Sequence, residues 1–326
     1  MKSKIKYPST LHPPPFTLHP FLLFTLLLFS CHTPATKEES ASAPAFAWSD
    51  SYDRNITLSA LPQRIISLSP AITEIIFLLE SEEKLVGISD FCTYPPETEK
   101  VAKVGGLLNF SIENLVSLNP DVVLIGSIIP KEDVKKMEEV GITVIAIKEE
   151  EKIEGIYHTL QIVGKLLDKE DLAKEKVTEL QAKMEGITSG LAQQTECPSI
   201  YYVVGFGESG DFTAPGNSHI NEIITLAGGK NIGEPLSAWN ISREYLFEQD
   251  PDIIFVRKED QAAFCKMFPY TQLKAVKEKR VYPIESGWID IVSPRNILAV
   301  EMMHERVRVL LCVCNAHSVE GGNSRF

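Results

Sequence analysis

Glu113 and Glu244 occupy matching positions in a segment that the chain contains twice. Ser, Glu, Leu, Pro and Asp recur in register between residues 111–125 and 242–256, and the offset is constant, since 244 − 113 and 252 − 121 both give 131. Each glutamate follows a serine that can cap a helix, so its carboxylate lies in a first helical turn. There it either offsets the helix dipole, worth about 0.3–1 kcal/mol, or binds a cationic group of a partner.

The residue types that perform catalysis or bind metal ions form no recognisable set. The sequence shows no Ser–His–Asp or Cys–His arrangement and no Cys-x-x-Cys pair. A bare metal ion needs three or four converging ligands, and the sequence around His219 supplies no such set. Gly205–Gly210 matches the dinucleotide fingerprint, but a loop containing Pro215 follows it where that motif requires a helix. The residues therefore indicate no enzymatic chemistry and no cofactor of the protein's own.

Length and composition point to a soluble protein with more than one lobe. The chain has 326 residues, of which 44% are apolar and 23% charged, and its net charge is −12. Such a length exceeds one typical domain, and the negative charge argues against a nucleic-acid partner. Two related halves most often fold as two related lobes, which leave a cleft between them.

The N-terminus has the pattern of an export signal. Lysines precede the apolar run 21–29, which is too short to span a bilayer comfortably. Leu28-Phe29-Ser30-Cys31 resembles the bacterial lipobox, in which the cysteine is lipidated; a plain signal peptide with a chance cysteine is the alternative. We expect a signal peptide over 1–31, a lipid anchor at Cys31 as the only contact with a membrane, and a flexible tether over 32–60.

Strands and helices alternate in both halves, which predicts α/β lobes with mostly parallel sheets over 61–150 and 193–311. Between them, 151–192 lacks proline and has apolar residues at helical spacing. One helix of about 30 residues there would be about 45 Å long; two helices with a turn near Asp168 are the alternative. Cys197 and Cys265 could pair, and 312–326 loses periodicity and is expected to be frayed.

Several motifs, taken in order, resemble a known family. The matching segments are Arg64–Glu74, Asp90–Pro96, Leu118–Val123, Ala227–Ile232 and Ser293–Arg295. Together they resemble the substrate-binding proteins of bacterial ABC importers for vitamin B12, iron–siderophores and haem, over about 62–308. The resemblance implies a class III periplasmic-binding-protein fold, in which two Rossmann-like lobes are joined by a single long helix. It also implies an exported, lipid-anchored monomer at the periplasmic face of a bacterial membrane.

The resemblance also implies a ligand, partners and site residues. The ligand is a chelate or corrinoid, and it contains cobalt or iron. The partners are a permease dimer and its ATPase, and Glu113 and Glu244 dock onto permease arginines. The cleft is expected to be lined by residues of both lobes: Phe91, Tyr94, Leu107 and Asn109 from the first, and Phe206, Trp239, Trp288 and Asp290 from the second.

Two features of the sequence leave alternatives open. The vitamin B12-binding members carry a tryptophan where Leu107 stands, so cobalamin competes with siderophores and haem as the ligand. Arg295, at a helix start, either holds a structural carboxylate or faces an anionic siderophore. A transition-metal-ion receptor and an exported two-lobed enzyme such as a chelatase are the alternative functions.

Overall fold

The computed structural model describes residues 45–148, 152–194 and 196–321, with side chains up to Cys312. All of these belong to one compact unit, Ala43–Phe326. The predicted signal peptide, Cys31 and the tether as far as residue 44 lie outside the described residues. No helix in the described ranges is both long and apolar enough to cross a membrane.

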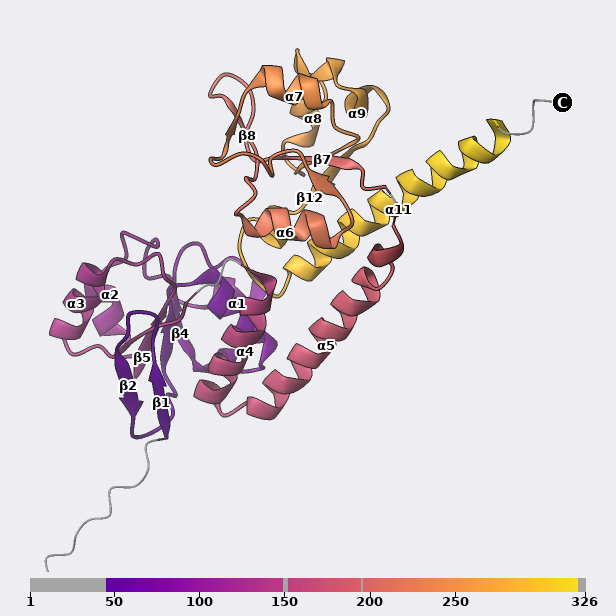
Figure 1. Ribbon diagram of the computed structural model, residues 1–326. Helices are drawn as coiled ribbons and strands as arrows, with labels where there is room; N and C mark the ends of the chain where they lie inside the picture. The colour runs from indigo at the N-terminus through magenta and orange to yellow at the C-terminus, as the bar shows by residue number, and fades with distance from the viewer. Residues whose placement is uncertain (1–44, 149–151, 195, 322–326) are drawn as a thin grey trace, which may run out of the picture. The chain divides into compact units, whose positions relative to one another are not determined.

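The N-terminal lobe is built on a parallel four-stranded sheet of order β4-β3-β5-β6 (Figure 1). Apolar residues on its two faces form two clusters, one beneath α1 and α4 and the other beneath α2 and α3. Because both faces are covered, strand β5 is buried at every position, as expected for a parallel sheet. The elements are β3 (Ile65–Ser67), α1 (Pro70–Leu78), β4 (Leu85–Ile88), α2 (Ile112–Ser117), β5 (Val122–Ile125), α3 (Lys131–Glu139), β6 (Val144–Ala146) and α4 (Ile153–Leu167).

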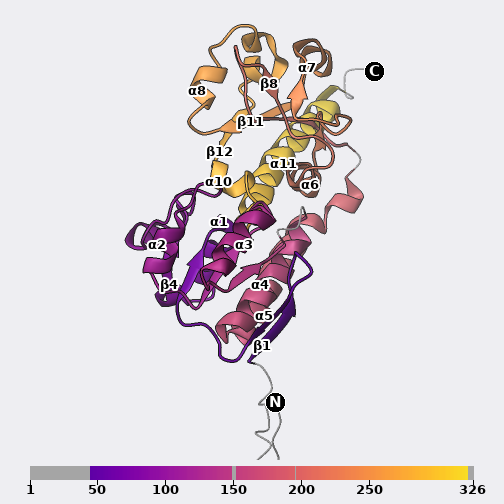
Figure 2. The same ribbon diagram turned by 90° about the vertical axis from the view of Figure 1, so that its left-hand side faces the viewer.

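The C-terminal lobe repeats this plan with the order β9-β7-β11-β12 (Figure 2). Numbered along the chain within each lobe, both sheets read 2-1-3-4, which confirms that the repeated sequence encodes a repeated α/β unit. Helices α6, α10 and α11 cover one face, and α7, α8 and α9 cover the other. The elements are β7 (Ser199–Val203), α6 (His219–Leu226), β9 (Lys230–Asn231), α7 (Arg243–Gln249), β11 (Ile253–Arg257), α8 (Gln261–Phe264), α9 (Lys274–Lys277), β12 (Val281–Ile284), α10 (Ser286–Ile289) and α11 (Asn296–Gly321).

The repeated Pro-Asp motif fastens the central pair of strands in each sheet. Asp121 Oδ2 accepts hydrogen bonds from the backbone N–H groups of Gln63 (2.7 Å) and Arg64 (2.9 Å), next to β3. Asp252 Oδ2 accepts bonds from the N–H (3.0 Å) and hydroxyl (2.8 Å) of Ser199, the first residue of β7. The constant offset between the two copies of this motif therefore has a structural cause.

The lobes are joined by one long helix, α5 (Glu170–Thr188), but it is shorter than predicted. Its 19 residues correspond to about 28 Å. The expected continuous helix of about 30 residues is wrong, and the alternative of two helices with a turn is correct. Asp168 ends α4 in a left-handed conformation, with φ of 62°. Gly164 then lets the helices pack closely, because a Cβ there would lie 2.4 Å from that of Ala173.

The predicted tether over 32–60 is wrong for its last part. Strands β1 (Phe46–Ser49) and β2 (Asn55–Leu58) form an antiparallel hairpin. Phe46 is 1% exposed and packs in the N-terminal core, which fixes the hairpin to the lobe. Asp50 closes the hairpin by an ion pair with Arg54. The N-terminal lobe therefore begins near residue 46.

The expected frayed tail is also wrong for most of its length. Helix α11 continues past Leu311 to Gly321, and residues 322–326 lie outside the described residues. Short elements complete the chain: β8 (Asp211–Phe212), β10 (Asn240–Ile241), and 3₁₀ turns at Glu82–Lys84, Pro96–Lys100, Leu191–Gln193 and Tyr270–Gln272.

Candidate ligand cleft and docking surface

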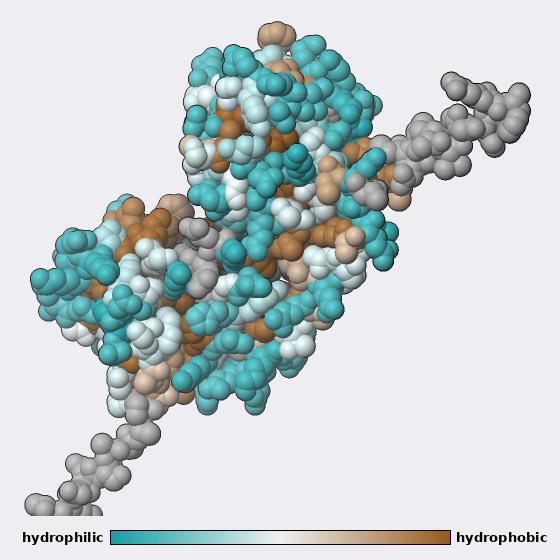
Figure 3. Space-filling view, viewed as in Figure 1, coloured by the Kyte–Doolittle hydropathy of each residue, from teal (hydrophilic) through white to brown (hydrophobic). Residues whose placement is uncertain are grey.

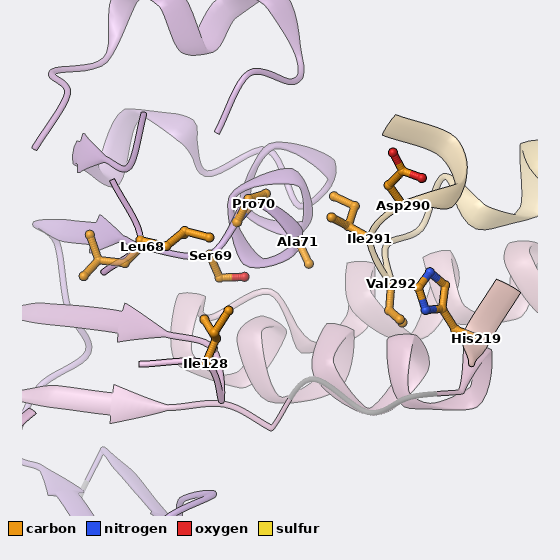
Figure 4. A pocket seen from close by; sticks show the side chains of 11 residues that line it. Leu68, Ser69, Pro70, Ala71, Ile128, His219, Asp290, Ile291 and Val292 are labelled. Atoms are coloured by element: carbon orange, nitrogen blue, oxygen red, sulfur yellow. The ribbon is translucent and has the colours of Figure 1, made fainter. Parts of the chain in front are cut away.

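A cavity of about 280 Å³ lies where loops of the two lobes meet (Figure 4). The N-terminal lobe contributes residues that follow β3 and β5, the two central strands of its sheet. The carboxyl ends of such strands, where the strand order reverses, are the usual ligand site of open α/β sheets. The cavity is lined by Leu68, Ser69, Pro70, Ala71, Leu107, Gly126 and Ile128 from the N-terminal lobe, and by His219, Asp290, Ile291 and Val292 from the C-terminal lobe.

The carboxylate and the imidazole ring of the cavity, Asp290 and His219, come from the C-terminal lobe. Asp290 accepts hydrogen bonds from the Tyr202 hydroxyl (2.7 Å) and from Nε of Arg257 (3.0 Å). Burial, together with the neighbouring Asp290 carboxylate, raises the pKa of Tyr202. This hydroxyl therefore stays protonated and donates the hydrogen bond to Asp290. His219 Nε2 lies 2.7 Å from the carbonyl oxygen of Ile289, to which it donates. These hydrogen bonds fix the orientation of the Asp290 carboxylate and of the His219 imidazole ring in the cavity wall.

Arg295 holds a carboxylate, as the structural interpretation of this residue predicts. Its guanidinium group forms a two-point ion pair with Glu74, with Nε to Oε2 at 2.9 Å. The Glu74 side chain is 4% exposed; burial raises its pKa, while the bonds from Arg295 and Ser293 oppose that rise. Glu74 lies on α1 and Arg295 just before α11, so the pair joins the two lobes. Gly287 leaves room for the Arg295 guanidinium group, since a Cβ at this position would lie 2.5 Å from Arg295 Nη1.

The same guanidinium group supports an aromatic residue that was predicted to bind ligand. The carbon at its centre lies 4.0 Å from the centroid of the Tyr94 ring, a cation–π contact. Tyr94 is still 43% exposed. One face of this ring is therefore held by the other lobe while much of the side chain stays open to solvent.

A second glutamate also links segments from the two halves. Glu222 on α6 accepts a hydrogen bond of 2.9 Å from the backbone N–H of Ile153, the first residue of α4. Thr73-Glu74-Ile75-Ile76 and Asn221-Glu222-Ile223-Ile224 echo one another in the sequence. Both glutamates of this second echo thus connect a helix of one half to a segment of the other.

The structure brings together only some of the residues predicted to bind ligand. Leu107 and Asp290 line the cavity. Phe206 is not among its lining residues: its half-buried ring packs edge-on against Phe264 (5.2 Å) and Tyr270 (5.8 Å), at the margin of the C-terminal core. The roles of the remaining candidates stay predictions. Phe91, Asn109 and Trp239 lie on exposed loops, and Trp288 is half-buried against the core.

Sequence reasoning missed several residues that line the cavity. Leu68, Pro70 and Ala71 were interpreted only as the end of a strand and the start of a helix, and Ile128 and Val292 were not considered. Only their position in the fold could have identified them. The loop after the first strand of each sheet lies where the strand order reverses, which is the usual ligand site of such sheets. Aromatic side chains drew attention to other loops instead.

Glu113 and Glu244 lie in equivalent surroundings on the two lobes. Ser111 Oγ accepts the N–H of Asn114 (3.2 Å), and Ser242 Oγ accepts the N–H of Tyr245 (3.1 Å), so both helices are capped as predicted. Both carboxylates are exposed, and neither forms an ion pair within the described part of the chain.

Apolar patches interrupt the mostly hydrophilic exterior of the lobes (Figure 3).

Two other motifs are resolved by the local structure. Strand β8 follows Gly210, so the glycine-rich segment lacks the helix that a dinucleotide site requires. Cys197 and Cys265 are free thiols and do not pair. Among the described residues, no group of three or more His, Cys, Asp or Glu side chains could hold a metal ion.

Comparisons with known proteins agree with this architecture. Residues 65–286 match the family described as periplasmic binding protein. The chain is 26% identical over 298 residues to the ABC transporter substrate-binding lipoprotein YvrC of Bacillus subtilis, covering 88% of this chain and 94% of YvrC. It is 26% identical over 257 residues to the vitamin B12-binding protein of Photorhabdus laumondii, covering 77% and 90%.

Solved structures share the fold at low sequence identity. The haem-binding protein RhuT of Roseiflexus superposes with a TM-score of 0.68 at 21% identity, covering 75% of this chain and 97% of RhuT. The vitamin B12-binding protein BtuF of Vibrio cholerae gives 0.66 at 22% identity, covering 76% and 98%. Since the family match spans both sheets and the helix between them, this chain belongs to the periplasmic binding protein family and is a binding protein of a transport system, not an enzyme.

Proposed function

We propose that this protein is the substrate-binding component of an ABC importer and captures a large chelate of the cobalamin, haem or iron–siderophore class. The observation that supports it most is the cavity at the meeting point of two duplicated α/β units. The relatives named above as an ABC transporter lipoprotein and a vitamin B12-binding protein support the same function.

The composition of the walls suits a ligand with unlike faces. The N-terminal wall is almost wholly apolar, with Leu68, Pro70 and Ile128, whereas the C-terminal wall offers Asp290 and His219. A macrocycle stacks on aromatic and aliphatic surface and directs its polar substituents toward fixed charges.

The contacts between the lobes favour a stiff receptor. Separating the Glu74–Arg295 pair would expose two charges that are nine-tenths covered or nearly so, with side-chain exposures of 4% and 14%. Removing one partner of a buried pair leaves the other charge unpaired and costs roughly 3–5 kcal/mol. We propose that the cleft therefore changes little in shape when it binds or releases its ligand.

For delivery, we propose that Glu113 and Glu244 dock onto cationic residues of the permease. The two lobes present these carboxylates in the same local setting, so a two-fold symmetric permease dimer could receive both in the same way. The receptor itself acts as a monomer. It is exported, and Cys31 carries the lipid that anchors it at the membrane surface.

The docking assignment is tested by the double variant Glu113→Ala, Glu244→Ala. We expect uptake by whole cells to fall at least roughly tenfold, as for loss of charged contacts at an interface, while ligand affinity stays the same. Glu132→Ala with Glu248→Ala is the matched control. Glu132 lies in the first turn of helix α3, and Glu248 shares helix α7 with Glu244; both are exposed. Unchanged uptake in the first variant would contradict the assignment.

The ligand is identified by titrating the tryptophan fluorescence of the purified protein. Cobalamin, cobinamide, haem and a set of ferric siderophores are the compounds to compare, and we expect one of them to quench at sub-micromolar concentration. Tight binding of zinc with no response to any chelate would instead favour a metal-ion receptor.

A further inference from the structure

The sequence repeat extends upstream of the two glutamates into the loops that lead to their helices. With the same offset of 131, the segment Leu108-Asn109-Phe110-Ser111 matches Trp239-Asn240-Ile241-Ser242, since 239 − 108 gives 131. Asparagine and serine are identical in the two copies, and the third position is apolar in both. These loops therefore belong to the duplicated unit as much as the capped helices do.

One position of this loop carries a large, exposed apolar side chain in both lobes. Leu108 is 59% exposed and Trp239 is 43% exposed. A single exposed apolar residue on a protein surface requires no explanation. The same exposure at equivalent positions, five residues before an exposed glutamate each time, indicates a shared role.

The preceding residue shows which side of the loop faces the ligand. Leu107 lines the cavity, and Leu108 is not among the described residues that do so. The equivalent of Leu107 in the other lobe is Ala238, since 238 − 107 gives 131. By this register Trp239 matches the outward position of Leu108, and neither Ala238 nor Trp239 is among the described residues that line the cavity.

We infer that Leu108 and Trp239 are the apolar parts of two matching docking contacts and that they engage the permease, not the ligand. This inference rests on the proposed function. Each contact consists of one apolar side chain and, five residues later, one carboxylate: Leu108 with Glu113, and Trp239 with Glu244. The partner is a two-fold symmetric permease that offers an apolar pocket and a cationic group on each subunit.

The two contacts are expected to differ in strength. Tryptophan is enriched among residues that dominate binding energy at interfaces, whereas leucine is under-represented. Trp239→Ala should therefore weaken docking by tenfold or more, and Leu108→Ala by roughly threefold. The exposed valines Val140 and Val309, each 50% exposed, provide control alanine variants outside the repeated loops.

The experiment measures docking and ligand binding separately. The full-length receptor is applied to its own permease–ATPase complex in lipid nanodiscs, without ligand, and its dissociation constant is obtained from surface binding. Cobalamin and haem serve as ligand probes in calorimetric titrations of the same variants. We expect Trp239→Ala and Leu108→Ala to weaken docking and to leave the affinity for either probe within about twofold, a range typical of residues outside a binding site.

An exchange variant tests the equivalence of the two positions. In L108W/W239L each lobe carries the residue of the other, and a two-fold symmetric partner can accept the receptor in either orientation. This variant should dock as tightly as the wild type. Unchanged docking in Trp239→Ala, or weaker probe binding with docking unaffected, would overturn the inference. Docking that survives loss of Glu113 and Glu244 but not of Trp239 would instead contradict the glutamate assignment alone.

Discussion

The two lobes have the same strand order and the same capped helices on their surfaces, but they contribute different walls to the cavity. The N-terminal wall is apolar, with Leu68, Pro70 and Ile128. The C-terminal wall contains Asp290, which is held by Tyr202 and Arg257. The strand order and the exposed capped helices are thus duplicated, whereas the residues that line the cavity differ. This pattern suits a protein that meets a symmetric partner and an asymmetric ligand.

The largest expected effect on stability distinguishes Glu74 from Glu222, which occupy equivalent positions in the two halves. Glu74→Ala leaves Arg295 without its partner in a site that is mostly covered, and should lower the free energy of unfolding by about 3–5 kcal/mol. Glu222→Ala removes only a hydrogen bond to the Ile153 N–H, and should cost about 1 kcal/mol. Urea denaturation monitored by circular dichroism compares them. Equal losses would show that the two links between the lobes have the same strength.

A smaller effect separates the core of the C-terminal lobe from the cavity wall of the N-terminal lobe. Phe206→Ala removes a ring that packs on Phe264 and Tyr270, and should destabilise the protein by about 2–3 kcal/mol without changing ligand affinity. Leu107→Ala should do the reverse, weakening ligand binding at nearly unchanged stability. Thermal unfolding and fluorescence titration provide the measurements. Loss of ligand affinity in Phe206→Ala would return this residue to the binding site.

The smallest expected effect concerns acid stability, which can be compared at one carboxylate in each half, Asp50 and Asp252. Burial alone would raise the pKa of Asp50 and Asp252, but hydrogen bonds from Arg54, and from Ser199 and Lys274, hold both values below normal. A carboxylate whose pKa is lowered in the folded state stabilises the protein at pH values above its unfolded pKa of 3.8. This stabilisation is lost as the pH falls through the pKa of the folded state.

Asp50→Asn and Asp252→Asn should therefore each lose about 1–2 kcal/mol at pH 7 and much less near pH 3, as expected for hydrogen bonds to a charged group. Unfolding free energies at the two pH values test this, and Asp50, whose side chain is fully covered, should give the larger difference. A pH-independent loss in both variants would mean that shape, not charge, is what these residues provide.

The sequence predicted the fold where local patterns agreed with the tertiary structure. The constant offset between Asp121 and Asp252 identified the two lobes because each residue fastens the same pair of strands. The break at Asp168 was less visible, since apolar residues continue at helical spacing on both sides of a left-handed residue. Phe46 was assigned to a tether because it ends a segment rich in Ser, Ala, Thr, Pro and Glu, yet its buried ring, with Trp48, Ile56 and Leu58, packs the hairpin against the core.

The site was less predictable because its residues are ordinary in type. Pro70 and Ile128 carry no chemical signal, and only the strand order brings them to one cavity. Phe206 was predicted to bind ligand as an aromatic residue, yet its neighbour Tyr270 comes from a distant segment that one sequence cannot place. The equivalent positions of Glu113 and Glu244 could be predicted because repetition itself is visible in a sequence; their docking role remains a prediction.

The identical 2-1-3-4 order of the two sheets has a consequence for the permease. If either lobe can meet either subunit, a loaded receptor arrives in two orientations that differ by half a turn, and its cargo enters facing opposite ways in the two cases. A translocation channel served in this manner has to accept both faces of its cargo equally, and selection among compounds then falls to the receptor before any gate opens.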